Sequence, residues 1–250
     1  MSINAVEIPK VIHLCWFSGE KFPVTLDRCI KSWQRVLPDY TIKLWDYDMA
    51  MATKIPFVEQ ALSVRKWAFA ADAIRLYALY TEGGIYMDAD VFLCSRFDEY
   101  LTNETVFFIE HHSKSDKKGN LLYDAVGIQA AFFAAQKGSE MIKHVLDYYV
   151  DSPFILADGS YATSIIAPAI YATEAERVGF KYVDEEQVIG SVTYYPSRYM
   201  AGNRRERVKE SFGIHLCYNS WHYKSRFKRF RHRLKDFYNK RLLSANKVPI

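Results

Sequence analysis

AADAIRLYALYTEGGIYMDADVF, residues 70–92, is the stretch of this sequence that decides the fold. Apolar residues recur at helical spacing in its first half, and the glycine pair in its middle can end a helix because glycine adopts backbone angles closed to other residues. The apolar run that follows predicts a strand over residues 85–93, with Asp88 and Asp90 inside it. Residues two apart in a strand point to the same face, about 6 to 7 Å apart, so we expect the two carboxylates to converge.

The acidic pair predicts a metal site. Two ionised carboxylates in a partly buried place repel one another unless a cation shares them. Mg²⁺ and Mn²⁺ accept oxygen ligands and keep positions open for the oxygens of a phosphate. Asp88 and Asp90 therefore indicate an Mn²⁺ or Mg²⁺ site that handles a diphosphate.

The preceding helix carries a second polar pair, Asp72 and Arg75, three residues apart on one face. Taken alone, this spacing is typical of a surface ion pair. Beside the glycine pair and the acidic pair, it indicates two side chains that point at a ligand next to the metal.

The ordered set of Asp72, Arg75, Gly83-Gly84 and Asp88-Ala89-Asp90 resembles glycosyltransferase family 32, whose common feature is the DXD sugar-binding region. Members of this family include mannosyltransferases and bacterial capsular polysaccharide and lipopolysaccharide enzymes. A more distant resemblance is to the glucosyltransferase domain of the clostridial toxins. An isolated Asp-X-Asp is a weak signal, whereas the ordered set is specific. The resemblance implies a GT-A fold, a nucleotide-binding α/β sandwich with the acidic pair at a strand end.

The opening strand, residues 8–17, resembles the family's first strand and nucleotide-binding loop. The resemblance implies that Trp16 stacks on the nucleotide base. A buried core aromatic is the alternative, and both readings stay open because packing and stacking favour the same flat ring. His13 in the same strand is expected to be structural.

Residues 214–221, IHLCYNSW, resemble a family segment in which a His is followed by Ser-Trp. The resemblance implies that His215 is a third metal ligand and that Ser220 and Trp221 belong to the donor site. A lone His in an apolar run is more often a core residue, so this reading depends on the Ser-Trp context.

Residues 127–135 resemble a family strand that usually carries an Asn facing the donor sugar. Gln129 or Ala130 stands there instead. The longer amide of Gln129 can make the same hydrogen bonds, whereas Ala130 at that position implies a different donor selectivity.

Apolar runs that alternate with helical segments predict an α/β fold with a mixed, mostly parallel sheet and helices on both faces. Half of the 250 residues are hydrophobic, enough for one core, so we expect a catalytic domain over residues 1–221 and a tail over residues 222–250. The expected strands are 11–17, 41–45, 85–93, 105–109 and 127–134, and the expected helices are 24–36, 57–80 and 138–150.

The tail holds ten Lys or Arg residues against Asp236 alone, a net charge of +9 that leaves −5 on the rest of the chain. Aromatic and leucine residues from Tyr223 to Tyr238 recur at helical spacing, so the tail is expected to form a basic amphipathic helix. Such a helix suits an anionic membrane surface, and packing on the domain is an equal alternative. Nucleic acid is not an expected partner because no recognised motif accompanies the charge.

The cysteine pattern and the N-terminus favour a cytoplasmic enzyme, peripheral on the inner face of the membrane. The four cysteines have no paired spacing and lie mainly in apolar runs, as reduced core thiols do. The N-terminus lacks a basic start and its apolar run is too short for a signal peptide.

Together these observations predict a metal-dependent glycosyltransferase of bacterial surface polysaccharide synthesis. It would move a hexose from a nucleotide diphosphate sugar to an acceptor glycan, expected to be lipid-linked. A UDP-sugar is the preferred donor, with GDP-mannose kept because the mannosyl branch of the family uses it. The resemblance implies retention of configuration, and we assign no catalytic base. The alternatives are a toxin-like protein glycosyltransferase and a non-enzymatic protein that binds membrane or nucleic acid through its tail.

Overall fold

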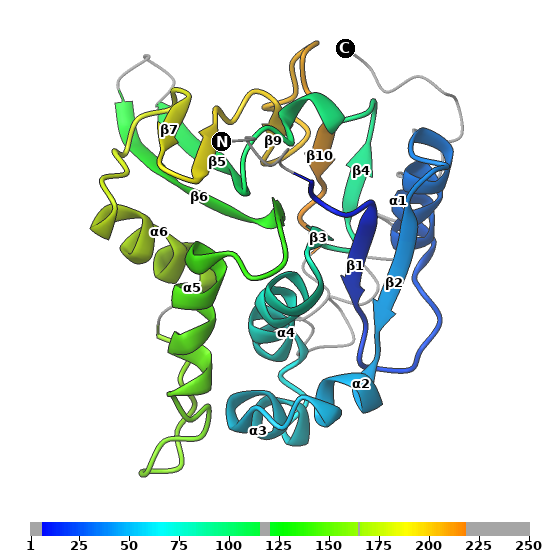
Figure 1. The fold of residues 1–250 in the computed structure, drawn as a ribbon, viewed down its shortest axis with the longest axis vertical. Helices are drawn as coiled ribbons and strands as arrows, with labels where there is room; N and C mark the ends of the chain where they lie inside the picture. Colours follow the sequence, from blue (N-terminus) through cyan, green and yellow to red (C-terminus); the bar gives the residue numbers. More distant parts are fainter. Residues whose placement is uncertain (1–6, 116–120, 165, 219–250) are drawn as a thin grey trace, which may run out of the picture.

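The protein is built on a large and a small β-sheet, with helices packed on both faces of the large one (Figure 1). The computed structural model describes residues 7–115, 121–164 and 166–218. The strands are β1 (Val11–Cys15), β2 (Thr41–Trp45), β3 (Gly84–Met87), β4 (Val91–Leu93), β5 (Thr105–Ser115), β6 (Leu121–Ala135), β7 (Gln187–Ile189), β8 (Val192–Tyr195), β9 (Met200–Ala201) and β10 (Gly213–His215). The helices are α1 (Val24–Val36), α2 (Tyr47–Ala52), α3 (Pro56–Ser63), α4 (Trp67–Glu82), α5 (Glu140–Val150) and α6 (Ala167–Arg177), with a short 3-10 helix at Asp98–Tyr100. The expected tail helix, Ser220 and Trp221 lie outside the described residues.

The large sheet has seven strands in the order β2-β1-β3-β6-β5-β8-β7, and the small sheet has three in the order β4-β10-β9. In the large sheet β1 runs parallel to both β2 and β3, and β5 runs parallel to β8. Strand β6 is antiparallel to its neighbours β3 and β5, and β7 is antiparallel to β8. Most strands therefore point one way, which confirms the expected mixed, mostly parallel α/β sheet.

Each face of the large sheet carries its own apolar core. On one face Tyr86 and Phe133 pack with residues of α2 to α6. On the other face Ile85 and Phe132 pack with α1 and the small sheet. Because alternate strand residues point to opposite faces, a buried sheet of this kind needs apolar residues in continuous runs, as the sequence shows.

The predicted helix over residues 57–80 is wrong in one respect, since the structure has two helices, α3 and α4, in its place. The chain breaks at Arg65, whose φ of 57° is left-handed and cannot continue a helix. The helices predicted at 24–36 and 138–150 correspond to α1 and α5. Helix α6 has Pro168 in its first turn, where proline is favoured because its backbone N–H is not needed there.

The glycine pair acts as predicted, because α4 ends at Glu82 and β3 begins at Gly84. Gly84 has a φ of 113°, and a Cβ atom there would lie 2.5 Å from the carbonyl oxygen of Val11 on β1. Only glycine allows β3 to start this close to β1.

The predicted single strand over residues 85–93 is also wrong, and the error falls on the acidic pair. The chain leaves the large sheet after Met87, turns, and continues as β4 in the small sheet. The turn is closed by a hydrogen bond from the Val91 N–H to the Asp88 carbonyl oxygen at 2.9 Å. Aspartate is rare in strands and common in turns because its side chain competes for backbone donors. Asp88 and Asp90 therefore lie in a turn that joins the two sheets.

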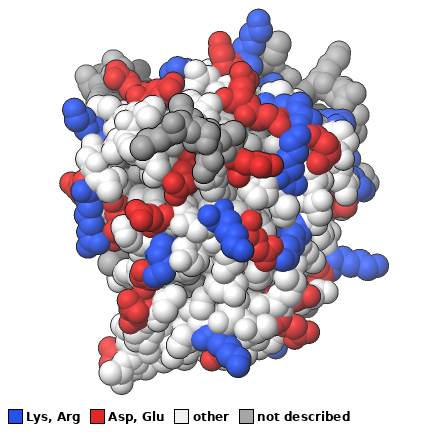
Figure 2. Space-filling model, in the orientation of Figure 1, with Lys and Arg blue, Asp and Glu red and all other residues white. Residues whose placement is uncertain are grey.

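Charged side chains of both signs are interspersed on the face of the molecule that Figure 2 shows. Within the part of the chain that the structure describes, we find no helix with the length and apolar character that a membrane span requires.

Candidate metal and donor site

The turn between β3 and β4 meets the end of β10, and this contact assembles three potential metal ligands. Strand β10 pairs antiparallel with β4 so that His215 stands opposite Val91, next to Asp90 in the chain. One ligand atom from each of Asp88, Asp90 and His215 lies within 4.8 Å of the others. The residues singled out in the sequence as metal ligands are thus brought together by the second sheet.

Helix α1 holds β4, the strand that follows this turn. The Trp33 indole N–H donates to the Val91 carbonyl oxygen at 2.7 Å, and the Ser32 hydroxyl accepts from the Leu93 N–H at 2.9 Å. Both side chains are buried, so these bonds form where water does not compete. They hold β4 at the position that presents Asp90.

Asp90 and His215 form a buried ion pair. The Asp90 Oδ1 lies 3.3 Å from the His215 Nε2, and its Oδ2 accepts the Tyr218 N–H at 2.7 Å. Burial raises the pKa of Asp90, but the imidazolium and the backbone N–H together outweigh it and lower that pKa below its usual value. Burial likewise lowers the pKa of His215, and Asp90 raises it to well above its usual range. A divalent cation at this place would take over the role of the imidazolium proton.

Asp88 is more open than Asp90. Its Oδ1 accepts the Tyr86 hydroxyl at 2.6 Å and lies 3.7 Å from the Arg75 Nη2. Among the described residues its Oδ2 has no hydrogen-bond partner, and 28% of the side chain is exposed. Asp88 therefore keeps one oxygen free toward solvent, as a ligand to an exchangeable ion requires.

Arg75 organises the floor of the site. Its guanidinium is buried, donates to the carbonyl oxygens of Ala71 at 3.1 Å and Ala130 at 2.7 Å, and lies over the Tyr86 ring at 4.6 Å. Its Nη2 pairs with the Asp72 Oδ1 at 2.8 Å. The Asp72–Arg75 pair is therefore a buried ion pair and not a surface one.

The Ala130 carbonyl is available because β6 bulges beside the turn. Residues 129–132 of β6 stand opposite Phe108 alone, between the pairs Phe107↔Phe133 and Ile109↔Ile128. A bulge releases backbone groups from the ladder. Here the Ala130 carbonyl accepts from Arg75, and the Ala131 carbonyl accepts the Asp88 N–H at 2.9 Å.

Asp72 is held mostly within the protein, with 14% of its side chain exposed. Burial raises the pKa of this carboxyl to about 6, Arg75 opposes that effect, and Asp88 adds to it. The charge of Asp72 therefore changes near pH 6, so its repulsion of a bound anion would depend on pH.

Trp16 follows β1 at the edge of the large sheet where the turn lies. The parallel register pairs His13 with Tyr86, so the end of β1 reaches the level of Asp88. The indole N–H donates to the Glu20 carbonyl oxygen at 2.7 Å. The indole ring packs on the Phe22 ring, with the ring centroids 4.8 Å apart. Trp16 is half-buried in a loop beside the site, a position that leaves both base stacking and core packing open.

The buried His13 has both ring nitrogens engaged, as a structural residue does. Its Nδ1 accepts from the Trp45 indole at 3.0 Å and its Nε2 donates to the Gly83 carbonyl oxygen at 2.8 Å, so the ring is neutral. Burial lowers the pKa of His13 in agreement with this.

Gln129 lies in the β6 bulge and is buried. Its Nε2 donates to the Met200 carbonyl oxygen at 3.4 Å, and its Oε1 has no partner among the described residues. The neighbouring Ala130 is fixed through its carbonyl, so of the two only Gln129 has a polar side-chain atom to offer.

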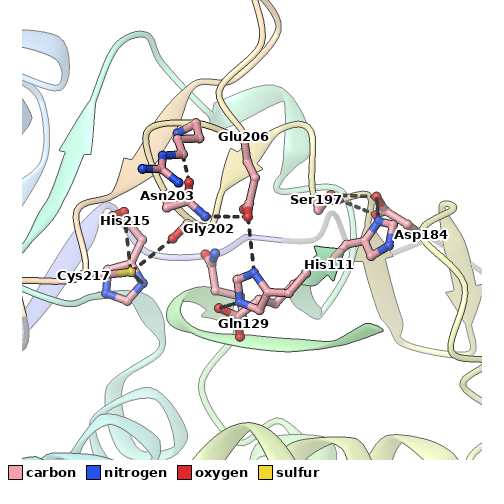
Figure 3. A network of polar contacts seen from close by, with 12 residues as sticks. His111, Gln129, Asp184, Ser197, Gly202, Asn203, Glu206, His215 and Cys217 are labelled. Atoms are coloured by element: carbon pink, nitrogen blue, oxygen red, sulfur yellow. Dashed lines mark hydrogen bonds and ion pairs between the residues drawn. The ribbon is translucent and has the colours of Figure 1, made fainter. Parts of the chain in front are cut away.

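Sequence reasoning missed a polar network beside these residues (Figure 3). His112 on β5 contacts Glu110 through Nε2 at 2.9 Å and Glu206 through Nδ1 at 3.3 Å. Asn203 donates to the same Glu206 oxygen. Glu110 and His112 lie on β5 beyond the strand predicted at 105–109, and Asn203 and Glu206 lie in the loop after β9. The only signal for them was a run of titratable side chains, Glu110-His111-His112, with no motif around it.

The comparison with known proteins bears on the same segment. Residues 23–107 match the model of the family described as "Glycosyltransferase sugar-binding region containing DXD motif". The resemblance found in the sequence is confirmed for this region. A match of 94 residues at 38% identity relates the chain to inositol phosphoceramide mannosyltransferase 3 of Schizosaccharomyces pombe. That match covers 36% of this chain and only 26% of the yeast protein.

A solved glycosyltransferase structure supports the architecture. The PaToxG glycosyltransferase superposes with a TM-score of 0.50 and 16% identity over 68% of this chain and 69% of its own. The galactosyltransferase LgtC, solved with donor and acceptor sugar analogues, gives a TM-score of 0.49 at 13% identity over 96% of this chain and 97% of its own. The DXD region thus sits in a fold of the GT-A glycosyltransferase type, as the resemblance implied.

Proposed function

We propose that this protein is a metal-dependent glycosyltransferase that moves a hexose from a nucleotide diphosphate sugar to an acceptor glycan. The observation that carries the proposal is the convergence of Asp88, Asp90 and His215 to within 4.8 Å at the edge of the central sheet. The first two belong to the matched DXD region, and the third comes from a strand far outside it. Because the three side chains come from separate parts of the chain, their convergence favours a binding site formed by the fold over a chance Asp-X-Asp sequence.

The three residues fit Mn²⁺ or Mg²⁺. Two carboxylate oxygens and one imidazole nitrogen suit Mn²⁺ in particular, and a set of three leaves coordination positions for the oxygens of a diphosphate. When bound, the ion neutralises the charge that develops on the leaving nucleotide diphosphate. An imidazole binds a metal ion in its neutral form, so metal binding requires His215 to lose the proton that forms its ion pair with Asp90.

The remaining residues hold the donor. Arg75 keeps Asp88 and the β6 bulge in place, and Asp72 beside it faces the donor sugar or ribose. Trp16 receives the base, and Gln129 offers an amide to the sugar from the opposite side. In the net reaction the acceptor hydroxyl forms the new bond to the anomeric carbon, and one nucleotide diphosphate and one proton are released. The configuration is retained, as in the family that the sequence resembles.

The donor is a UDP-sugar in our proposal, and the acceptor is a glycan carried on a lipid at the cytoplasmic face of a bacterial membrane. The tail over residues 222–250, with its net charge of +9, supports attachment to an anionic surface. The yeast relative is named a mannosyltransferase, so GDP-mannose belongs in any test of the donor.

Nucleotide release by the purified full-length chain tests the proposal. UDP-glucose, UDP-galactose, UDP-N-acetylglucosamine and GDP-mannose are each supplied with Mn²⁺, and released UDP or GDP is measured. We expect turnover of one donor that EDTA abolishes and Mn²⁺ restores. Asp151→Asn on the exposed end of α5 serves as a control that keeps this turnover. Equal nucleotide release with EDTA and with Mn²⁺, or none from all four donors, contradicts the proposal.

A further inference from the structure

The β5–β6 hairpin extends past the acidic turn and carries an open polar face. Met87, the last residue of β3, pairs with Phe132, so the part of β6 before that point lies beyond the end of β3. On this extension Glu110 pairs with Gly127 and His112 pairs with Ala125. Directly paired residues of antiparallel strands share one face. Two polar side chains therefore stand beside two small residues.

The small residues leave room above the strands. A Cβ atom built on Gly127 would meet nothing within 4 Å, and Ala125 is exposed. Glu206 closes one side of this space, from the loop after β9. We call Glu110, His112 and Glu206, with the floor of Ala125 and Gly127, the hairpin polar face.

The hairpin polar face has hydrogen-bonding capacity that the described residues do not use. Glu110 and Glu206 make their contacts with His112 and Asn203 through Oε1. Within the described residues the Oε2 atoms of both glutamates make no hydrogen bond. The side chains are 23% and 35% exposed, and that of His112 is 38% exposed, so a ligand can reach them.

A buried group next to this face on β6, the Gln129 amide that the proposed function gives to the donor sugar, would place an acceptor bound at the face beside the reacting sugar. Gln129 lies two residues after Gly127 on β6, and its Oε1 has no partner although the residue is 1% exposed. An unpartnered buried carbonyl oxygen is unfavourable, and such atoms are found where a bound group completes them. Its Nε2 donates to the carbonyl oxygen of Met200, two residues before Gly202, where an added Cβ atom would meet Glu206.

The face is joined to the metal site through Gly202. The Cys217 thiol, two residues after His215, donates to the Gly202 carbonyl oxygen at 3.3 Å. A Cβ atom on Gly202 would lie 2.8 Å from the Glu206 Oε2 and 3.4 Å from the His112 Cε1. The hairpin polar face and His215 therefore flank the same short segment of chain. The loop of Trp16, on the β1 side of the turn, lies across the metal site from this hairpin.

We propose that the hairpin polar face binds the acceptor, through the hydroxyl groups of an uncharged sugar. This inference rests on the proposed function, which gives the β1 side of the metal site to the nucleotide. Free carboxylate oxygens accept from sugar hydroxyls, and these charge-assisted bonds are the strong kind. Two carboxylates against one imidazole also disfavour an anionic sugar, because like charges in a half-buried place repel. The acceptor ring bound here is thus a neutral hexose and not a uronic acid or a sugar phosphate.

Binding of simple glycosides to the full-length chain with Mg²⁺ and UDP tests this assignment. The probes are the methyl glycosides of glucose, galactose and mannose, and methyl β-D-glucuronide as the anionic counterpart of the glucoside. Saturation-transfer NMR gives their apparent dissociation constants. We expect saturable binding of at least one neutral glycoside, and at least about tenfold weaker binding of the glucuronide than of the glucoside.

Three variants locate the site. Glu110→Gln and Glu206→Gln should each weaken neutral glycoside binding by about tenfold or more, because a charged acceptor is lost. Gly127→Leu fills the open space over the floor and should abolish glycoside binding without relying on any hydrogen bond. Glu140→Gln, which removes the same charge from the start of α5, is the matched control and should bind like the wild type.

UDP binding with Mg²⁺ separates the possible failures. All variants should keep their affinity for UDP within about twofold, which also shows that they fold. A wild-type chain that binds neither UDP nor GDP with Mg²⁺ refutes the proposed function. A wild-type chain that binds UDP but no glycoside refutes the acceptor role of the hairpin polar face alone. Glycoside binding that stays unchanged in Glu110→Gln, Glu206→Gln and Gly127→Leu refutes it as well. Equal binding of the glucoside and the glucuronide refutes the selection for an uncharged sugar.

Discussion

Replacing Arg75 by Met is expected to destabilise the protein more than any change to an exposed ion pair. Arg75→Met keeps much of the side-chain volume but removes the donors to Ala130 and Ala71 and the partner of Asp72. Breaking a buried ion pair on one side costs about 3–5 kcal/mol, because the other charge stays buried without compensation. Asp72 limits this loss by taking up a proton, which costs about 1.4 kcal/mol at pH 7 because its pKa in the wild type is already raised to about 6.

The carbonyl oxygens of Ala130 and Ala71 lose a donor as well, so the expected loss in the free energy of unfolding is about 3 kcal/mol, equivalent to about 6 to 12 °C in Tm for a chain of this size. The loss should also depend on pH. In the wild type the pKa of Asp72 is raised to about 6, so its contribution to stability is greatest below the unfolded pKa and is lost as pH rises through about 6. Without Arg75, which lowers this pKa, the decline continues above pH 6. The deficit of Arg75→Met should thus be larger at pH 7.5 than at pH 5.

Urea unfolding of wild type and variant at the two pH values measures this. Arg96 provides the matched control, since it also pairs with two aspartates, Asp39 and Asp98, but is 45% exposed. Solvent screens such pairs, so Arg96→Met should lose little stability. If Arg75→Met loses no more than Arg96→Met, or if its deficit is the same at both pH values, then the buried pair does not hold the site as argued.

Four further changes test other parts of the structure. Asp90→Asn should abolish Mn²⁺-dependent nucleotide release while circular dichroism still shows a folded chain, and unchanged turnover at saturating Mn²⁺ would exclude Asp90 as a ligand. His215→Ala should weaken UDP binding in the presence of Mn²⁺ by about tenfold or more in calorimetry, whereas normal UDP binding would make His215 a core residue. Gly84→Ala should lower the free energy of unfolding by at least about 2 kcal/mol in urea titration, because the left-handed backbone and the approach to Val11 both exclude a Cβ atom; an unaffected midpoint would contradict the tight start of β3. Deleting residues 222–250 should remove co-sedimentation with anionic vesicles at low salt, and equal sedimentation of both forms would mean that the tail does not bind the membrane.

The sequence was most informative where local rules decide the structure. Helix α1 has the predicted bounds because its apolar stripe is interrupted by charge on one face only. The glycine pair marked the end of α4 because the backbone there is closed to other residues. His215 was singled out through a resemblance, and its approach to Asp90 then needed the pairing of β10 with β4, which no local pattern contains.

Where pairing over long distances decides the structure, sequence reasoning failed. The run from Gly84 to Leu93 is apolar enough for one strand, and only its partners show that it serves two sheets. The break at Arg65 has neither glycine nor proline to mark it. The hairpin polar face combines β5, β6 and the loop after β9, so Glu110 and Glu206 could be connected only once the fold was known.

The separation of the three candidate metal ligands along the chain has a consequence for how the protein is made. About half the length of the chain separates Asp90 from His215. During synthesis the two aspartates therefore leave the ribosome long before the histidine, and β4 has no antiparallel partner until β10 follows. An unfinished chain holds two carboxylates without the third ligand and without the small sheet that carries it. Under the proposed function, the capacity to hold a cation and a sugar nucleotide thus arrives only with β10, the last strand of the described fold.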